Sequence, residues 1–351
     1  MRFKECLSYD DVLLVPQYSD IVSRREVNIS TSLGKGFDFL IPIISSPMDT
    51  ITESEMAYRM SSFGGLGIIH RYNSIDKQCE LIYDALHIAN GKPTAGIKVG
   101  AAIGVTGDYL ERATLAVEQG GATLLCVDVA HGHHILMKKA LRQLRLLFQD
   151  DVHIMAGNVA TLEGYEDLCR WGASSVRCNI GSGAICSTKI QTGHGVSGLQ
   201  TILDCAKSKY AGEIPIIADG GLRNSGDIVK ALAAGADMVM LGSLLSGTKE
   251  TPGQVLRDSQ DRLSKVYRGM ASKEAQNRWK GSHSSNEGIA TTVPYKGKVS
   301  GVLSDLENGI RSGLSYSGAR DILELQSKAK FIKQTTSGMA ESRTHILDLK
   351  R

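Results

Sequence analysis

Short runs of apolar residues recur along the 351-residue chain, and segments with helical spacing separate them. Continuous apolar runs of this length are typical of parallel strands buried on both faces, covered by amphipathic helices. Eight strands are predicted, at residues 40–45, 66–70, 99–104, 124–129, 153–156, 174–180, 214–218 and 238–241. Eight such units over this length predict an α/β fold, a closed (β/α)8 TIM barrel rather than an open doubly wound sheet.

The segments between and beyond these strands complete the predicted domain. Helices are predicted at residues 108–119, 135–148, 161–171 and 225–234. After the eighth strand, a polar run rich in Ser, Asn, Gly and His indicates an active-site flap at about 271–292. Two C-terminal helices, at roughly 304–312 and 317–330, are expected to close the barrel. The connection at 76–94 leaves no room for an inserted domain, so a single domain, 1–351, is expected.

Polar residues gather directly after the predicted strands. They include Asp128, residues 157–158, Asp219 and residues 242–243. In a βα barrel the carboxyl ends of all strands meet at one mouth, where active sites lie. These side chains are therefore expected to converge on one site.

The loop at residues 181–188 (GSGAICST) follows the sixth predicted strand and belongs to that mouth. Its two glycines bare the backbone, which lets a ligand or an ion approach closely. Cys186 supplies a thiol that attacks an electrophile once deprotonated, and Thr188 supplies a nearby hydroxyl that relays a proton. A glycine turn beside a structural cysteine is the alternative, and the convergence of the other polar turns makes it the weaker one.

Glycines after the seventh and eighth strands indicate a phosphate site. Residues 219–221 read Asp-Gly-Gly, and residues 242–243 read Gly-Ser. Backbone N–H groups at such turns attract an anion, and the serine hydroxyl adds a donor. Asp219 is placed to accept hydrogen bonds from ribose hydroxyls. Two ordinary glycine turns are the alternative.

Composition argues against several classes of function. The net charge of +3 comes without a basic block or an aromatic-interleaved basic stripe, so no nucleic-acid partner is expected. The first residues lack the apolar core of a signal peptide, and no apolar run approaches the length of a membrane span. Seven cysteines without a CxxC pair argue against a disulfide framework and a zinc site. A cytoplasmic protein with reduced thiols and no membrane partner is expected.

Three further patterns admit a functional interpretation. Residues 128–134 (DVAHGHH) suggest a metal site, but three histidines within four residues of a loop cannot all face one ion. Asp128 is better suited to accept from a cofactor ribose or amide. Residues 64–67 (GGLG) precede a strand instead of following one, so a Rossmann fingerprint is rejected. Glu287 is a solvated carboxylate unless the flap folds over Cys186 and Thr188.

Together these motifs resemble the catalytic barrel of the IMP dehydrogenase and GMP reductase family over nearly the whole chain. The resemblance rests on residues 8–16 (SYDDVLLVP), 46–50 (SPMDT), 128–132 (DVAHG), 157–159 (GNV), the loop at 181–188, 219–221 (DGG), 267–270 (YRGM), 287–288 (EG) and 293–297 (VPYKG). It implies a purine nucleoside monophosphate whose C2 lies over Cys186. The thiolate would add to C2, and hydride would pass between C2 and a nicotinamide cofactor, NAD or NADP.

The resemblance also implies a role for individual residues. The catalytic set would be Cys186, Thr188, Glu287 and Arg278. The nucleotide-binding set would be Ser46, Met48, Asn158, Arg177, Asp219, Gly220, Gly221, Gly242, Ser243, Tyr267, Gly269 and Met270. Asp128 and Asn158 would face the cofactor, and the carbonyls of Gly181, Gly183 and Cys186 resemble the family's potassium (K+) site. Family members are homotetramers, and residues 338–342 (GMAES) resemble the segment that reaches the neighbouring subunit's ion.

Several positions depart from the family pattern. Ala184 stands in place of a serine that usually helps hold phosphate, Asn179 in place of a glycine, and Lys189 in place of an arginine. Residues 197–198 (SG) stand where Pro-Gln is typical. These departures bear on nucleotide affinity. The regulatory CBS pair that most IMP dehydrogenases insert before the third strand is absent from this sequence.

The direction of the reaction rests on the flap. A dehydrogenase hydrolyses a thioimidate with a flap arginine–tyrosine pair, whereas the nearest match here is Arg278 followed by Trp279. Tryptophan has no hydroxyl to support the arginine, which favours a reductase. The motifs at 46–50 and 128–132 resemble the dehydrogenase. We therefore expect an IMP dehydrogenase-type enzyme (IMP + NAD + water to XMP + NADH). GMP reductase (GMP + NADPH to IMP + ammonia) and a non-catalytic nucleotide-binding paralogue are the alternatives.

Overall fold

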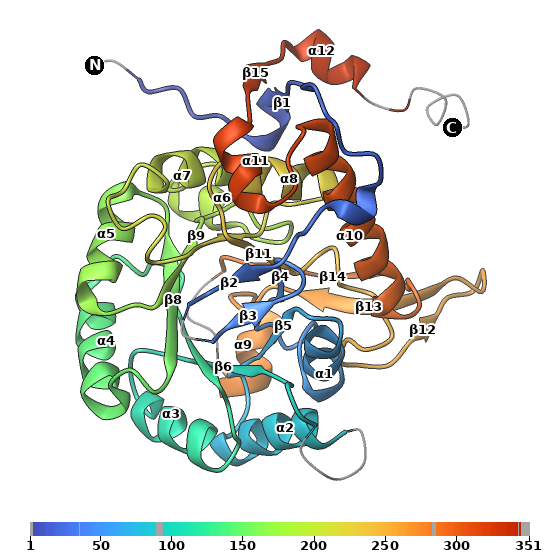
Figure 1. Cartoon of the computed structure of the whole chain (residues 1–351). Helices are drawn as coiled ribbons and strands as arrows, with labels where there is room; N and C mark the ends of the chain where they lie inside the picture. Colours follow the sequence, from blue (N-terminus) through green and yellow to red (C-terminus); the bar gives the residue numbers. More distant parts are fainter. Residues whose placement is uncertain (1–2, 35, 89–93, 283–285, 343, 345–351) are drawn as a thin grey trace.

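Eight parallel strands form a closed barrel in the order β10-β11-β4-β5-β6-β7-β8-β9 (Figure 1). The computed structural model describes residues 3–34, 36–88, 94–282, 286–342 and 344. The strands are β4 (Ile43–Ser45), β5 (Leu66–Ile69), β6 (Val99–Ile103), β7 (Leu124–Asp128), β8 (His153–Val159), β9 (Ser175–Cys178), β10 (Ile216–Asp219) and β11 (Met238–Leu241). Each overlaps a predicted strand, so the predicted TIM barrel is confirmed.

A ring of helices covers the outside of the barrel (Figure 1). Its members are α1 (Ser54–Ser62), α2 (Ile75–His87), α3 (Tyr109–Glu118), α4 (Ile135–Phe148), α5 (Leu162–Trp171), α7 (Gly198–Cys205), α8 (Ser225–Ala233) and α10 (Val299–Tyr316). Side-chain caps fix several helix starts: Thr161 accepts from the backbone N–H of Gly164, and Asn224 from that of Asp227. Within the described residues, no helix is both long and apolar enough to cross a bilayer.

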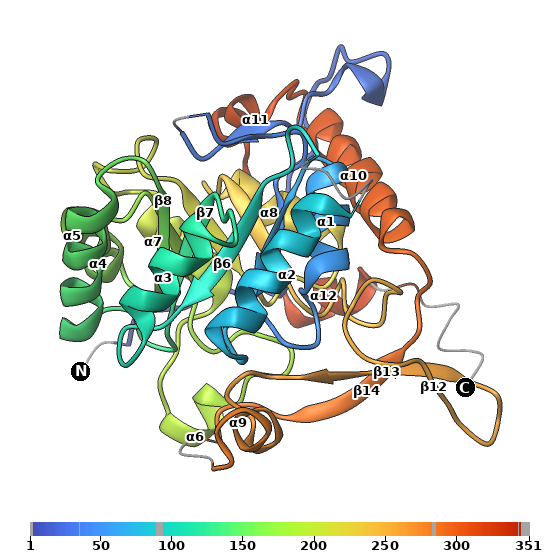
Figure 2. The ribbon, with the colours of Figure 1, turned by 90° about the horizontal axis from the view of Figure 1, so that it is seen from below.

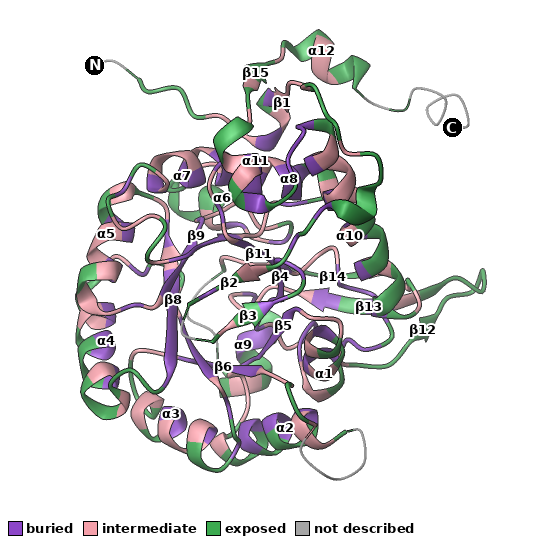
Figure 3. Ribbon diagram, in the orientation of Figure 1, coloured by how far each residue is buried: buried purple, intermediate pink, exposed green. Residues whose placement is uncertain are grey.

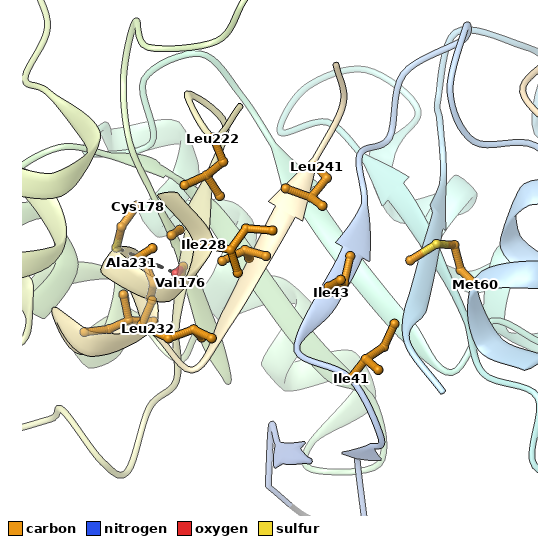
Figure 4. Close-up of a cluster of buried hydrophobic side chains, with 14 of the residues drawn as sticks. Ile41, Ile43, Met60, Val176, Cys178, Leu222, Ile228, Ala231, Leu232 and Leu241 are labelled. Atoms are coloured by element: carbon orange, nitrogen blue, oxygen red, sulfur yellow. Dashed lines mark hydrogen bonds between the residues drawn. The ribbon is translucent and has the colours of Figure 1, made fainter. Parts of the chain in front are cut away.

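The core lies in two layers, one inside the barrel and one between strands and helices. Figure 3 shows the barrel strands buried, whereas the helices are buried mainly on the side that faces the barrel. Figure 4 shows part of the outer layer, where Ile228 and Leu232 of α8 and Val176 of β9 belong to one cluster of buried apolar side chains. All three are buried. This packing holds the strand ends, and the loops that follow them, in fixed relative positions.

A short hairpin lies across the N-terminal end of the barrel. Its strands are β2 (Thr31–Ser32) and β3 (Asp38–Phe39), and in Figure 1 it crosses the barrel centre. Leu33 and Phe39 are buried in the inner apolar cluster. This end of the barrel is therefore filled with packed side chains, which leaves the opposite mouth for ligands.

The C-terminal region contains more secondary structure than the sequence predicts. Helix α10 is longer than expected and packs against α8 and α1, which places it in the last helix position of the barrel. After it come α11 (Ile322–Lys328) and β15 (Phe331–Lys333). Strand β15 pairs with β1 (Val12–Leu14), a pairing across the whole chain that the sequence patterns do not indicate. The tail then forms α12 (Thr336–Glu341).

The predicted flap is connected to a small antiparallel sheet at the barrel mouth. Strands β12 (Leu256–Arg257), β13 (Leu263–Arg268) and β14 (Ala290–Pro294) form the sheet, and α9 (Lys273–Lys280) lies between β13 and β14. Figure 2 shows α6 (Thr188–Thr192), α9 and this sheet at the same end of the barrel. Within the predicted flap at 271–292, positions 283–285 lie outside the described residues.

Candidate active site

A cleft of about 460 Å³ opens at the C-terminal mouth of the barrel. The predicted site residues that line it are Ser46, Met48, Asp128, Asn158, Arg177, Gly181, Gly183, Cys186, Thr188, Asp219, Gly220, Gly221, Gly242, Ser243, Tyr267, Gly269, Met270 and Glu287. The structure thus brings every predicted site residue to one cavity except Arg278. Barrel closure explains this convergence, because it gathers the ends of all eight strands.

The loop after β9 presents a thiol and a hydroxyl together. The Sγ of Cys186 lies 3.1 Å from the Oγ1 of Thr188, the first residue of α6. The backbone N–H of Cys186 donates to the carbonyl of Gly183 at 3.0 Å, which closes a tight turn. Both side chains are half-buried and line the cleft. The pair can therefore pass a proton while the thiol stays open to a ligand.

The flap is docked on this loop. The backbone N–H of Ser187 donates to the carbonyl of Glu287 at 3.0 Å, and that of Ile289 donates to the carbonyl of Ile185 at 3.1 Å. These bonds form a bridge between Cys186 and Gly288. Glu287 was expected to have a role only if the flap folds over Cys186 and Thr188. The flap does fold over Cys186, and Glu287 lines the same cleft.

A buried arginine joins two acidic side chains at the cleft floor. Arg177 Nη1 lies 2.6 Å from Asp128 Oδ1, and Arg177 Nη2 lies 2.7 Å from Asp219 Oδ2. Burial alone would lower the pKa of the guanidinium, but Asp219, Cys126 and Asp128 outweigh it and hold the pKa well above its ordinary value. The arginine therefore stays charged and keeps both carboxylates in place.

Two asparagines extend this network toward the glycine turns. Asn158 Nδ2 donates to Asp219 Oδ2 at 2.6 Å and to the carbonyl of Asn179 at 3.1 Å. Asn179 Nδ2 donates to the carbonyl of Asp219 at 2.7 Å. Three side chains, those of Arg177, Asn158 and Asn179, therefore hold Asp219 in place. They fix the position at which the following glycine turn starts.

The glycine turns after β10 and β11 have the geometry expected of an anion site. Gly220 and Gly221 adopt φ values of +80° and +77°, a region that glycine enters without strain. A Cβ on Gly242 would lie 3.1 Å from the hydroxyl oxygen of Tyr267 and 3.2 Å from the Sδ of Met48. Burial, with a smaller effect of Asp219, raises the pKa of Tyr267, so its hydroxyl stays protonated. These turns offer backbone N–H groups and the Ser243 hydroxyl to an anion, and Tyr267 adds a second hydroxyl donor.

Arg278 is the predicted residue that the cleft lining does not include. It lies on α9, where the neighbouring Trp279 stacks on Tyr72 with ring centroids 4.3 Å apart and planes 16° apart. The guanidinium of Arg71 lies 5.7 Å from the Trp279 ring. This packing holds α9 against Arg71 and Tyr72, and Arg278 is not among the residues that line the cleft.

Arg71 and Tyr72 line the cleft and were not predicted as site residues. Arg71 Nη2 donates to the carbonyl of Asp128 at 3.3 Å. The signal that indicates them is their place directly after the second strand, among the polar turns of the mouth. The flap residue Gln276 also lines the cleft, and the sequence carries no local sign of that position.

The candidate ion ligands are backbone carbonyls. Carbonyl oxygens suit an alkali cation, and Gly181, Gly183 and Cys186 supply three of them in one turn. The carbonyl of Gly183 accepts one hydrogen bond and keeps a second lone pair. Among the described residues, no three His, Cys, Asp or Glu side chains are grouped so as to hold a metal ion.

The sequence profile of the IMP dehydrogenase / GMP reductase domain matches residues 6–345. The chain belongs to this family. It is 35% identical to an inosine-5'-monophosphate dehydrogenase of Nitrosopumilus maritimus, over 98% of this chain and 99% of the relative. It is 37% identical to the Cryptosporidium parvum enzyme of the same name (98% and 96%) and 31% identical to a GMP reductase of Leishmania major (97% and 97%).

A solved structure shares the fold closely. The crystal structure of a GMP reductase from Trypanosoma brucei, in complex with guanosine 5'-monophosphate, matches with a TM-score of 0.90. It is 30% identical and covers 98% of each chain. The family consists of oxidoreductases that act on purine nucleoside monophosphates with nicotinamide cofactors. Relatives of both activities align with nearly the whole chain, so similarity alone does not separate them.

Proposed function

We propose that this protein is a purine-nucleotide oxidoreductase that works through a covalent bond between Cys186 and C2 of the base. The observation that supports it is the Cys186–Thr188 pair, 3.1 Å apart, in a cleft that also holds the glycine turns and Asp219. A nucleophile, a proton path and an anion site within one cavity are what such a reaction requires.

The nucleotide would lie across the cleft from the glycine turns to the thiol. Its phosphate would contact the backbone N–H groups of Gly221 and Gly242, together with the hydroxyls of Ser243 and Tyr267, while the N–H of Gly220 donates to the carbonyl of Met240. Asp219 would accept from the ribose hydroxyls. The base would lie among residues that line the cleft beside Cys186, namely Ser46, Met48, Gly269 and Met270.

The chain's own residues supply the nucleophile and move the protons. Cys186 adds to C2 as a thiolate, and its proton leaves toward Thr188 and then Glu287. A nicotinamide cofactor facing Asp128 and Asn158 would donate or accept the hydride. When the C2–S bond breaks, the thiolate is released, and Thr188 would pass it a proton taken from solvent.

Two further features of the family are proposed for this chain. The carbonyls of Gly181, Gly183 and Cys186 would hold K+ and stiffen the turn that carries the thiol. Residues 338–342 of a neighbouring subunit would complete that site in a cytoplasmic homotetramer. The coarse expectations of no nucleic-acid partner and no membrane partner stay part of the proposal.

The flap geometry favours the reductive direction, GMP and NADPH to IMP and ammonia. In that direction the thiolate adds to C2, and the proton taken from the thiol passes through Thr188 and Glu287 to the amine nitrogen, so that the C2–N bond breaks and ammonia leaves. Hydride then reaches C2, and the C2–S bond breaks to release the thiolate. No water has to be activated. The dehydrogenase needs a base for water, and Arg278 lies outside the cleft lining while Trp279 is stacked on Tyr72.

IMP dehydrogenase is the second candidate, and a different observation favours it. The motifs at 46–50 and 128–132 resemble the dehydrogenase, and the relatives of that name reach 35% and 37% identity. In that direction hydride leaves C2 for the cofactor, and water hydrolyses the remaining thioimidate. Arg278 would then have to move into the cleft.

One assay tests the proposal. Purified protein with K+ is mixed with GMP and NADPH, and separately with IMP and NAD, while the absorbance of the reduced nicotinamide is followed. A fall in the first mixture supports the reductase, and a rise in the second supports the dehydrogenase. Arg278→Ala should leave a reductase unchanged and should slow a dehydrogenase. If the absorbance changes in neither mixture while the protein still binds nucleotide, the protein is a non-catalytic paralogue.

A further inference from the structure

The segment at residues 242–251 follows β11 and starts at the cleft. Gly242 and Ser243 line the cleft, and two of the proposed phosphate contacts lie there. The segment turns at once, because the N–H of Ser246 donates to the carbonyl of Gly242 at 2.9 Å. Its far end, from Thr248 onward, is largely buried. The position of Gly242 and Ser243 therefore depends on how that far end is held.

Lys265 is a buried cation that holds the far end. It lies on β13 and is only 2% exposed. Its Nζ donates to three backbone carbonyls, those of Thr248 at 3.3 Å, Lys249 at 3.2 Å and Thr251. Burial of a charged group is costly unless hydrogen bonds compensate for the lost water, and three acceptors match the three N–H groups of an ammonium. The far end of the segment is therefore built around this side chain.

Tyr267 lies two residues farther along β13 and contacts the start of the same segment. Residues two apart on a strand point to the same face, and Lys265 and Tyr267 are both buried, whereas Val266 between them is 38% exposed. A Cβ on Gly242 would lie 3.1 Å from the Tyr267 hydroxyl oxygen. One face of β13 therefore contacts the segment at both ends, with Tyr267 at its start and Lys265 at its far end.

A second lysine, Lys296, reaches the segment from beyond the end of β14, the strand that pairs with β13. Its Nζ donates to the carbonyls of Ser243 and Leu244, both at 3.0 Å. Its backbone N–H donates to the carbonyl of Gly247 at 2.8 Å. Lys296 is exposed, so its ammonium should stabilise the segment less than the buried Lys265 does.

We propose that Lys265 is a positioning residue for the 5′-phosphate of the nucleotide, and that Lys296 supports it. Lys265 fixes the far end of the segment against β13, and Tyr267 on the same strand face meets its start. The two contacts set the distance between the Tyr267 hydroxyl and the backbone of Gly242, both proposed phosphate donors. Because β13 leads directly into the flap, they also join the flap to the phosphate end. The inference rests on the proposed function in taking a purine nucleoside monophosphate as the ligand.

Hydrogen exchange tests the anchoring without any ligand. In Lys265→Met the backbone N–H groups of residues 242–251 should exchange roughly tenfold faster, because three carbonyls lose their donor. Lys296→Met should raise the same rates by about threefold. Lys249→Met is the matched control, because this exposed lysine lies in the segment itself, and it should leave the rates unchanged. Unchanged exchange in both Lys265→Met and Lys296→Met would overturn the proposal.

Calorimetric titration with GMP and IMP, and with guanosine and inosine, tests the positioning role. Lys265→Met should weaken binding of the substrate nucleotide by about tenfold and Lys296→Met by about threefold, while binding of the nucleoside stays unchanged because it has no phosphate. The KM for the nucleotide should rise in proportion, with kcat within about twofold of the unchanged protein. Lys296→Arg keeps the charge and the donors and should restore the affinity.

A lysine with a merely structural role gives a different result. It would weaken nucleotide and nucleoside binding alike, or neither, and either result would overturn the proposal. If Lys265→Met does not fold, Lys296→Met at its exposed position decides between these outcomes. If the unchanged protein binds neither nucleotide, the proposed function and the positioning role both fail, while hydrogen exchange still decides whether Lys265 anchors the segment.

Discussion

The two ends of the barrel differ in whether their ionisable side chains are paired with an opposite charge. At the mouth, Arg177 is paired with Asp128 and Asp219 at 2.6 and 2.7 Å. At the N-terminal end, His153 is buried and Asp237 is partly buried, and neither side chain forms an ion pair with another described residue. His153 Nε2 lies 2.8 Å from the Ser175 hydroxyl, and Asp237 accepts from the backbone N–H of Ile216 at 2.7 Å.

The pKa values follow this difference. At the mouth, the two carboxylates keep the pKa of Arg177 well above its ordinary value despite burial. At the other end, burial, with repulsion from Arg145, lowers the pKa of His153 to about 3, and burial raises that of Asp237 to about 6. Charge is thus retained where a ligand would use it, and neutral forms are favoured where the structure only has to pack.

The largest expected effect is at the mouth. Cys186→Ala should reduce turnover by roughly 10⁴-fold or more, because no other group can form the bond to C2. Nucleotide binding should persist, and calorimetry together with the nicotinamide assay measures both. Cys6→Ala is the control, since Cys6 is exposed and is not among the residues that line the cleft. Normal turnover in the Cys186 variant would remove the covalent mechanism.

The paired charge at the mouth should be costly to break. Arg177→Met leaves two carboxylates without their partner, and we expect a loss of about 3–5 kcal/mol in the free energy of unfolding together with weaker nucleotide binding. Urea unfolding measures the first quantity. Arg320→Met removes an exposed ion pair with Asp20 and should change neither. Equal effects of the two variants would contradict the difference between buried and surface charge.

The N-terminal end should respond to acid. The folded-state pKa of His153 is about 3 and its ordinary value is 6.5, so its contribution to stability is complete above pH 6.5. It falls as the pH drops from 6.5 toward 3, by up to about 1.4 kcal/mol per pH unit. His153→Gln should flatten that part of the stability–pH curve while leaving turnover unchanged. A curve of the same slope in both proteins would show that His153 does not carry the effect.

The smallest expected effect concerns Asp237. Its folded-state pKa is about 6 against an ordinary 3.8, so its stabilising contribution is present below pH 3.8 and is lost as the pH rises through 6. Asp237→Asn keeps an acceptor for the N–H of Ile216 and removes the buried charge. The variant should melt roughly 2 °C or more higher at pH 8 and show no gain at pH 4. A gain of equal size at both pH values would point to packing instead of charge.

Much of the barrel could be predicted because its signals are local. Runs such as 238–241 coincide with the observed strand, and the polar turns after the strands lead to one cleft because barrel closure requires it. The structure of the flap was harder to predict from the sequence. Its position followed from composition, but α9 and the stacking of Trp279 on Tyr72 depend on residues some 200 positions apart, which no local pattern encodes.

Local sequence patterns are enough to predict the barrel, the place of its mouth and the thiol, hydroxyl and glycine turns found there, because each depends on the order of neighbouring residues. The way in which these parts meet depends on the folded molecule. It placed Arg177 between Asp128 and Asp219, docked Glu287 on the Cys186 loop and left Arg278 outside the cleft lining. Such contacts join distant segments, and their geometry is set by packing in three dimensions.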